Sequence, residues 1–433
     1  MGAEAHRVGP ARRLAGEPRV PGDKSISHRA LLLNALAEGS ARVRGLGLGA
    51  DVLATERCLR ALGVVIEPDG PDGRVVHGVG LHGLREPDDV LDAGNSGTTM
   101  RLLCGVLAGQ PFFSVLTGDA SLRRRPMARV LEPLRAMGAE AWGRAGGQHA
   151  PLALRGGPLR ALDYALPVAS AQLKSALLLA GLQARGTTHL REPAPSRDHT
   201  ERLLRAQGVA LRSEGRDLWL TPPERPLRPV DLVVPGDFSA AAFWLVAACV
   251  HPDARITVRD VGINPGRTGL LDVLRAMGAR VTLANERWVG GEPVADLTAE
   301  SSALRGTTVG GDLIPRLLDE VPVLAVAMAV ADGPSRITDA AELRVKESDR
   351  LQAVAVELGQ LGARVVEEPE GLRFAGGDRL RGAAVDSHGD HRLAMALAIA
   401  ALIATGETWI ADAASVAISY PTFWEHLAAL AAA

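Results

Sequence analysis

Basic and acidic residues gather in short motifs where helices are predicted to begin. The motifs are "KSISHR" from Lys24, "GNSGTTMR" from Gly94, "SAQLKS" from Ser170, "SRDHTER" from Ser196, "DEVP" from Asp319, "KESDR" from Lys346 and "GDHR" from Gly389. A helix N-terminus has unpaired N–H groups and about +0.5 of an elementary charge, so each start can attract an anion. These motifs therefore predict a site for anionic groups.

The cations of these motifs are suited to binding phosphate and carboxylate groups. They are Lys24, Arg29, Arg125, Arg197, Lys346, Arg350 and Arg392. The guanidinium fork matches the paired oxygens of such anions, and lysine supplies a compact charge. If even half of these cations lie close together in the folded chain, the site holds two anionic groups.

Each motif also has a simpler explanation. "SLRRRPM" around Arg125 could be a solvated charge run, and "SRDHTER" could be a capped helix start with exposed charges. Glu347 and Arg350 are three residues apart and could form an ordinary surface pair on a helix. A single motif therefore decides little.

Two carboxylates are candidates for proton transfer. Asp319 and Glu347 lie beside the apolar runs "VPVLAVAMAV" and "LQAVAVEL", where partial burial can tune them against Lys24, Lys346 or His391. The sequence has no Ser-His-Asp or Cys-His spacing typical of a nucleophile. "GNSGT" lacks the P-loop ending, and "HGDHR" has no second cluster to complete a metal shell. The pattern favours acid–base chemistry on an anionic substrate.

Composition restricts the class of protein. A chain of 433 residues with 47% hydrophobic residues exceeds the size of a single core, so two domains are expected. A net charge of -2 opposes a nucleic-acid binder. Cys58, Cys104 and Cys249 lie in apolar runs, which predicts inert core thiols in a reducing compartment. Without a signal segment or an apolar run long enough to span a membrane, we expect a cytoplasmic protein with no membrane partner.

A helix-end phrase divides the chain into similar units. It reads "LRALGV" from Leu59, "LRAMGA" from Leu134, "LRAQGV" from Leu204, "LRAMGA" from Leu274 and "LGQLGA" from Leu358. Its glycine stands where a helix ends in a left-handed residue, and a β-prone run follows. Five copies and a C-terminal remainder predict six units.

The turn "VPGD" occurs at Val20–Asp23 and again at Val234–Asp237. We interpret the two turns as crossings between domains, for which Pro and Gly supply the backbone geometry. Residues 22–235 then form one domain, and residues 1–21 with 236–433 form the other. Lys24, Ser25 and Arg29 follow the first turn, whereas Phe238 replaces the lysine after the second.

Seven segments together resemble the 5-enolpyruvylshikimate-3-phosphate synthase family, from about residue 15 to the end. They are "PGDKSISHRALLL", "DAGNSGTTMRLL", "LPVASAQLKSALLLAGL", "SRDHTERLL", "LLDEVPVLAVA", "ELRVKESDRL" and "GDHRLAMALAIA". The resemblance implies an α/β (α+β) fold, a two-domain inside-out α/β barrel with three βαβαββ repeats per domain and an active site in the interdomain cleft. It implies transfer of the enolpyruvyl group of phosphoenolpyruvate to shikimate 3-phosphate by a monomer, with no metal or organic cofactor.

The resemblance also implies roles for individual residues. Those similar to the phosphoenolpyruvate contacts are Lys24, Gly97, Arg125, Gln172, Arg350 and Arg392. Those similar to the shikimate 3-phosphate contacts are Ser25, Arg29, Ser170, Ala171, Gln172, Arg197, Asp319 and Lys346. Asp319 matches the base for the 5-hydroxyl, and Lys24 or Glu347 would protonate the methylene carbon on the way to a tetrahedral intermediate. On this interpretation the first "VPGD" introduces a catalytic helix start and the second retains only a hinge.

Three positions have alternative or unusual features. Gly97 either serves a turn that needs a positive φ or leaves space for a ligand. Ile418 stands where many members have a lysine, and Glu342 where they have an asparagine. Both differences resemble a branch often less sensitive to the inhibitor glyphosate.

Other functions remain to be compared with this one. An enolpyruvyl transferase for UDP-N-acetylglucosamine would have a reactive cysteine in the loop "TGDASLRRRPM", which has none. An RNA-end cyclase of related repeats would need a nucleotide-linked histidine and a more basic, aromatic face. A non-catalytic anion-binding module would not need Asp319 and Glu347.

Overall fold

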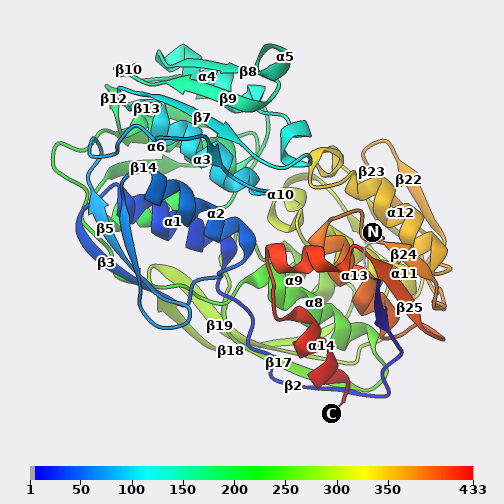
Figure 1. Ribbon diagram of the computed structural model, residues 1–433. Helices are drawn as coiled ribbons and strands as arrows, with labels where there is room; N and C mark the ends of the chain where they lie inside the picture. The colour runs from blue at the N-terminus through cyan, green and yellow to red at the C-terminus, as the bar shows by residue number, and fades with distance from the viewer. Residues whose placement is uncertain (1–4, 433) are drawn as a thin grey trace. The chain divides into compact units, whose positions relative to one another are not determined.

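The computed structural model describes residues 5–432, which fall into two compact units (Figure 1). The insert unit consists of residues 22–234 and the short segment Trp288–Glu292. The terminal unit consists of the segment that ends at Pro21, the segment Pro235–Arg287 and the segment that begins at Pro293. The chain therefore passes between the units at four places.

The insert unit contains three four-stranded sheets of the same topology. The first strand of each pairs in parallel with the second, and the other pairs are antiparallel. In spatial order, the strands of one sheet are β16 (Leu232–Val233), β3 (Glu38–Arg44), β5 (Arg74–Val79) and β4 (Val65–Pro68). Those of a second sheet are β6 (Leu91–Asp92), β7 (Phe113–Thr117), β9 (His149–Arg155) and β8 (Glu140–Gly143). Those of the third are β11 (Asp163–Ala165), β13 (Thr188–Arg191), β15 (Asp217–Thr221) and β14 (Ala210–Glu214). A small parallel pair joins β10 (Leu159–Arg160) and β12 (Ala184–Arg185).

The terminal unit repeats this pattern twice and ends with a shorter version. The two four-stranded sheets consist of β18 (Arg280–Val289), β19 (Glu292–Glu300), β17 (Ala254–Gly262) and β2 (Leu14–Gly16), and of β20 (Thr308–Val309), β21 (Ser335–Ile337), β23 (Gly371–Phe374) and β22 (Val365–Glu368). The third sheet consists of β1 (His6–Val8), β25 (Thr408–Ala411) and β24 (Ala384–Asp386). Six related sheets match the predicted six units, with the last one completed by the N-terminal strand.

The helices divide between the two units. Those of the insert unit are α1 (Lys24–Ala35), α2 (Ala50–Ala61), α3 (Gly97–Leu107), α4 (Ala128–Met137), α5 (Arg144–Gly147), α6 (Ala171–Gly181) and α7 (His199–Ala206). Those of the terminal unit are α8 (Phe238–Val250), α9 (Gly269–Ala276), α10 (Ile314–Leu317), α11 (Val321–Val330), α12 (Arg350–Gln360), α13 (His391–Ala401) and α14 (Phe423–Ala431).

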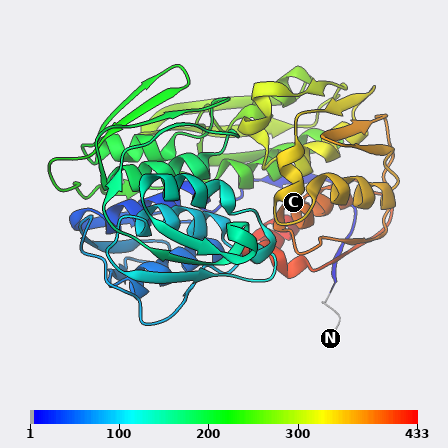
Figure 2. The same cartoon turned by 90° about the horizontal axis from the view of Figure 1, so that it is seen from above.

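In each unit, the most buried helices pack together in the core. Helix α3 packs on α6 in the insert unit, and α8, α11 and α13 pack on one another in the terminal unit. Every residue of α13 is buried, and all of α8 except Val250, because their sequences are apolar on all sides. The helices of the insert unit lie beside one another in Figure 2, with strands outside them. This arrangement confirms the predicted inside-out α/β fold.

The five repeated glycines end helices as predicted. Their φ angles lie between 86° and 112°, in the left-handed region that glycine adopts without strain. They are Gly63, Gly138, Gly208, Gly278 and Gly362. Each helix end is followed by an outer strand of its sheet, which explains why the phrase recurs once in each complete unit.

Both "VPGD" turns end on a residue that caps a helix. Asp23 accepts a hydrogen bond from the Ile26 amide at 2.9 Å, and Asp237 accepts one from the Ser239 amide at 2.7 Å. A Cβ atom at Gly22 would lie 1.7 Å from the Gly45 carbonyl oxygen. The glycine of the first turn is therefore required by close approach of two backbone segments.

The three cysteines are buried, as predicted. Burial raises the pKa of each thiol to about 12, so the thiols stay protonated and unreactive at neutral pH. Within residues 5–432, every helix is too short or too polar to cross a bilayer.

Candidate active site

The first cluster of candidate residues begins at the start of α1. Lys24 is the first residue of that helix, and its Nζ donates to Asp51 Oδ2 at 3.0 Å. Asp51 lies in the first turn of α2, and the side chains of Lys24 and Asp51 are only 16% and 7% exposed. The sequence pointed to Lys24 but not to Asp51, which is separated from it by 27 residues.

Arg29 lies on the next turn of α1 and connects three helices. Its Nε donates to Thr200 Oγ1 at 2.6 Å, and its Nη2 donates to Ser175 Oγ at 2.8 Å. Its Nη1 donates to the Ser25 carbonyl at 2.9 Å. Because Thr200 belongs to α7 and Ser175 to α6, the structure brings the predicted residue Arg29 next to both helices and bonds it to Ser25.

The starts of α3 and α6 are joined through a glutamine. Arg101 Nη1 donates to Gln172 Oε1 at 2.7 Å, and Gln172 Nε2 donates to Thr98 Oγ1 at 2.8 Å. Ser170 caps α6 by accepting from the Leu173 amide at 3.3 Å, and Ala171 is the first residue of α6. Gln172 therefore has a fixed orientation, and Arg101 is a further cation that sequence reasoning missed.

Arg125 is buried rather than solvated. It is 6% exposed, and its Nη2 donates to Asn95 Oδ1 at 2.6 Å. The neighbouring Arg123 and Arg124 are exposed. The charge-run interpretation is thus wrong for Arg125, which places its guanidinium beside the "GNSGT" turn.

Gly97 does not serve a turn with a positive φ. It is the first residue of α3, and the positive φ of 57° in this motif belongs to Gly94. A Cβ atom at Gly97 would lie 2.7 Å from Arg101 Nη1 and 3.3 Å from Arg125 Nη1. The turn explanation is therefore wrong, and glycine here leaves room for two guanidinium groups.

Arg197 lies in the loop that precedes α7. This side chain is half-buried, as are its neighbours Ser196 and Asp198, whereas His199 and Thr200 are buried. Asp198 precedes the helix but makes no side-chain capping bond to it. The interpretation of this motif as a cap with exposed charges is therefore wrong.

The second cluster, in the terminal unit, is centred on Arg350. This guanidinium donates from Nε to Asp390 Oδ2 at 2.8 Å and from Nη2 to Glu347 Oε2 at 2.7 Å. Burial disfavours its charge, but Asp390 and Glu347 outweigh this and raise the pKa of Arg350. The Glu347–Arg350 pair is therefore not a surface pair. It is not within a helix either, because α12 begins at Arg350.

Asp319 lies near two guanidinium groups of this second cluster. Its Oδ1 lies 3.5 Å from Arg350 Nη1, and its Oδ2 lies 3.7 Å from Arg392 Nη2. Both distances exceed those of strong charge-assisted hydrogen bonds. Burial lowers the pKa of Lys346, although Asp319 favours its charged form. Asp319 thus interacts with three cations, Lys346, Arg350 and Arg392.

Asp390 is the main residue of this cluster that the sequence did not identify. It caps α13 by accepting from the Arg392 amide at 2.9 Å. Burial would raise the pKa of this carboxyl, but Arg350 holds it below its usual range. Among the residues that the structure describes, no group of three His, Cys, Asp or Glu side chains is arranged to hold a metal ion.

The structure therefore divides the predicted site residues into two clusters. Those of the insert unit are Lys24, Ser25, Arg29, Gly97, Arg125, Ser170, Ala171, Gln172 and Arg197. Those of the terminal unit are Asp319, Lys346, Glu347, Arg350 and Arg392. Arg350 contacts both candidate carboxylates, Asp319 and Glu347, and cations beside such groups suit proton transfer on an anionic substrate.

Comparison with known proteins first defines the class. The fold is shared with the enolpyruvyl transferase NikO of Streptomyces tendae, which superimposes with a TM-score of 0.80 over 99% of this chain and 98% of its own, at 22% identity. EPSP synthase from Acinetobacter baumannii superimposes with a TM-score of 0.86 at 43% identity, over 98% and 97% of the two chains.

Sequence comparison then gives the family. The profile of EPSP synthase (3-phosphoshikimate 1-carboxyvinyltransferase) matches residues 8–427. Relatives named 3-phosphoshikimate 1-carboxyvinyltransferase include one from Gloeobacter violaceus, 59% identical over 98% of both chains, and one from Herpetosiphon aurantiacus, 57% identical over 97% of this chain and 98% of its own. The chain belongs to the EPSP synthase family.

The reaction follows from this membership. The protein transfers the enolpyruvyl group of phosphoenolpyruvate to shikimate 3-phosphate, in the shikimate pathway. The activities weighed as alternatives, on UDP-N-acetylglucosamine or on RNA ends, are not favoured by these relatives.

Proposed function

We propose that the two clusters act on one pair of substrates. Lys24, Arg125, Arg350 and Arg392 bind phosphoenolpyruvate, with Gly97 leaving space beside it. The observation that carries this proposal is the burial of Arg125, Arg350 and Arg392, each at most 6% exposed. Buried guanidinium groups are preorganised to bind an anion, because little side-chain freedom is lost on binding.

Shikimate 3-phosphate is bound by residues at three helix starts of the insert unit. Ser25 and Arg29 come from α1, Ser170 to Gln172 from the start of α6, and Arg197 from the loop before α7. Lys346 of the terminal unit adds a further charge. The hydrogen bonds of Arg29 to α6 and α7 support this proposal, because they fix one phosphate-binding group relative to the others.

Proton transfer uses the carboxylates of the terminal unit together with Lys24. Asp319 takes the proton of the 5-hydroxyl, while Lys24 or Glu347 delivers a proton to the methylene carbon of phosphoenolpyruvate. The hydroxyl oxygen bonds to the enol carbon, which gives a tetrahedral intermediate. Loss of inorganic phosphate from this intermediate, together with removal of a proton from its new methyl group, restores the double bond of the enol ether.

A phosphate-release assay tests the reaction and the two binding sites together. Release is expected only with both substrates present. Replacing Arg125 by Gln should raise KM for phosphoenolpyruvate, whereas Arg197→Gln should raise KM for shikimate 3-phosphate, each by about 10- to 100-fold for loss of a charge-assisted contact. Arg123→Gln is the matched control, because Arg123 is exposed in the same loop as Arg125.

Two outcomes would contradict this proposal. Release without shikimate 3-phosphate would mean that another acceptor, such as water, is used. If the Arg125 and Arg197 variants each changed both KM values equally, neither residue would be specific for one of the two substrates.

Replacing Gly97 by alanine is expected to weaken ligand binding without unfolding the protein. The added methyl group would displace the tips of Arg101 and Arg125 and crowd the space proposed for phosphoenolpyruvate. Such crowding costs about 1–3 kcal/mol. Glyphosate is longer than phosphoenolpyruvate, so its inhibition constant should rise more than the KM for phosphoenolpyruvate.

This prediction is checked by measuring both constants and the melting temperature. Alanine is a better helix former than glycine, so the melting temperature should not fall. An equal rise of the two constants together with a lower melting temperature would indicate a purely structural role for Gly97.

We further propose that the protein is a cytoplasmic monomer. The three buried thiols suit a reducing compartment. Light scattering after size-exclusion chromatography should give the mass of a single chain.

A further inference from the structure

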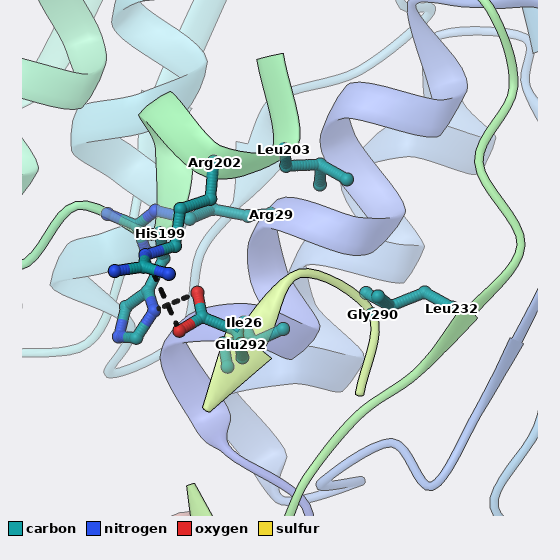
Figure 3. A pocket seen from close by; sticks show the side chains of 8 residues that line it. All are labelled: Ile26, Arg29, His199, Arg202, Leu203, Leu232, Gly290 and Glu292. Carbon is teal, nitrogen blue, oxygen red and sulfur yellow. Dashed lines mark hydrogen bonds and ion pairs between the residues drawn. The ribbon is translucent and has the colours of Figure 1, made fainter. Parts of the chain in front are cut away.

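The tip of the β18–β19 hairpin, Trp288–Glu292, belongs to the insert unit, although most of both strands belongs to the terminal unit. Figure 3 shows Glu292 facing His199 and Arg202 of α7. His199 Nδ1 lies 2.7 Å from Glu292 Oε1, and the two residues are 3% and 4% exposed. A buried hydrogen bond therefore connects the hairpin tip with the first residue of α7.

Arg202 reinforces the same contact one turn further along α7. Its Nη1 donates to the Gly291 carbonyl at 3.0 Å, and its guanidinium carbon lies 5.6 Å from the centre of the Trp288 ring. Its Nε lies 3.8 Å from Glu292 Oε2 and donates to Asp198 Oδ1 at 2.8 Å. The tip thus contacts both the helix and, through Arg202, the loop before it.

The segment from Arg197 to Thr200 is held in this way. It contains the proposed phosphate-binding residue Arg197 and is bonded to a second one, Arg29. Arg197 lies two residues before His199, and Thr200 accepts the 2.6 Å hydrogen bond from Arg29. Arg29 also lines the pocket of Figure 3 together with His199 and Glu292. A shift of the first turn of α7 would therefore move both guanidinium groups.

A second set of contacts holds the other end of this segment. Lys174 Nζ lies 3.0 Å from Glu192 Oε2 and 2.7 Å from Glu201 Oε1, and Glu192 accepts a hydrogen bond from Ser196 Oγ. Ser196 is thus held by Glu192, only four residues before it in the sequence. At the His199 end, by contrast, the partner is a residue 93 positions away on the hairpin.

His199 depends on Glu292 for its orientation. Its Nε2 is buried and has no hydrogen-bond partner among the described residues, so Glu292 fixes the ring through Nδ1. Removing the carboxylate would leave both ring nitrogens without a partner, and the cost of burying them would favour a different position of the ring.

We propose that Glu292 is a positioning residue for shikimate 3-phosphate, acting through His199 on the placement of Arg197 and Arg29. This inference rests on the phosphate-binding roles proposed above. If Glu292 acted through its charge alone, its removal would change the affinity for shikimate 3-phosphate in the opposite direction. Glu292 is an anion near Arg29, so loss of its charge alone would strengthen the binding of an anionic phosphate.

The variants Glu292→Ala and His199→Ala break the same contact from its two sides. Each is expected to raise KM for shikimate 3-phosphate by about 5- to 30-fold, within the range of coupling between residues in contact. The kcat and the KM for phosphoenolpyruvate should stay within about twofold, because their proposed residues are not in this segment. Glu292→Gln, which keeps an acceptor for His199, should restore most of the affinity.

Glu286→Ala is the matched control. Glu286 is an exposed glutamate of β18 in the part of the hairpin that belongs to the terminal unit. This variant should leave all constants unchanged. An unchanged or lower KM for shikimate 3-phosphate in both Glu292→Ala and His199→Ala would overturn the inference.

A double-mutant cycle with Arg197→Gln separates this inference from the proposed function. If Glu292 acts through Arg197, Glu292→Ala should raise KM by less in the Arg197→Gln background than in the wild type. Fully additive effects would overturn the inference alone. No effect of Arg197→Gln by itself would instead overturn the phosphate-binding role of Arg197.

Discussion

Replacing Asp319 by asparagine is expected to lower kcat by about 10²- to 10⁴-fold, the range for loss of a general base. Asparagine keeps the shape of the side chain but cannot take the proton of the 5-hydroxyl. Asp319 Oδ1 lies 3.5 Å from Arg350 Nη1 and its Oδ2 lies 3.7 Å from Arg392 Nη2, contacts whose geometry asparagine can keep. The KM for shikimate 3-phosphate should therefore change by no more than about threefold.

The KM for phosphoenolpyruvate gives a second check on this assignment. Arg350 and Arg392 are proposed to bind this anion. In Asp319→Asn neither guanidinium group has the negative charge of Asp319 beside it, so both attract an anion more strongly. KM for phosphoenolpyruvate should therefore stay the same or fall while kcat collapses. Steady-state kinetics with each substrate varied would measure both effects.

Asp332→Asn is the control for Asp319→Asn. Asp332 is an exposed aspartate beyond the other end of α11, so this variant should have wild-type kinetics. A kcat near that of the wild type in Asp319→Asn, with the melting temperature unchanged, would exclude Asp319 as the base.

Local features of the fold were predictable from the sequence. The five glycines that end helices and the two aspartates that cap α1 and α8 act within a few residues of their own position. Short-range geometry of this kind depends on residue type alone, since only glycine adopts a positive φ without strain. The six-unit architecture followed from repetition of such signals.

Contacts between distant residues were not predictable in the same way. Lys24 is paired with Asp51, Arg101 with Gln172, and Arg350 with Asp390, across 27, 71 and 40 residues. Nothing in the local pattern around Asp51 or Arg101 distinguishes a buried partner from an exposed helical charge. The resemblance to a family identified one member of each pair, and the fold was needed to show the other.

The burial of charged groups also depends on the tertiary structure. "SLRRRPM" contains two exposed arginines and one buried arginine, although all three have the same local sequence character. The hairpin tip at Glu292 is a similar case, because alternation along β18 and β19 gives no sign that the tip contacts α7. The second "VPGD" turn does more than the predicted hinge: Asp237 caps α8 and accepts a 2.8 Å hydrogen bond from Arg267.

Replacing Lys24 by methionine is expected to damage both the binding of phosphoenolpyruvate and its turnover. Methionine keeps most of the length of the side chain but removes the charge that is proposed to hold the anion and to deliver a proton. Loss of preorganised electrostatic stabilisation typically lowers kcat by about 10²- to 10³-fold. The KM for phosphoenolpyruvate should rise as well, because the ground state and the transition state use the same charge.

Asp51 makes part of this effect an indirect one. Its Oδ2 accepts from Lys24, and its Oδ1 is buried with no hydrogen-bond partner in the described part of the chain. In Lys24→Met the carboxylate stays buried without this ion pair, which costs about 1–3 kcal/mol of folding free energy. Its negative charge would also repel phosphoenolpyruvate, so the single variant overstates the direct contribution of Lys24.

The double variant Lys24→Met with Asp51→Asn separates the two contributions. Removing the leftover charge should recover the melting temperature and part of the affinity for phosphoenolpyruvate. It cannot restore proton delivery, so kcat should stay low if Lys24 is the donor to the methylene carbon. A kcat that returns to the wild-type value in the double variant would leave Glu347 as the donor and give Lys24 a purely electrostatic role in binding.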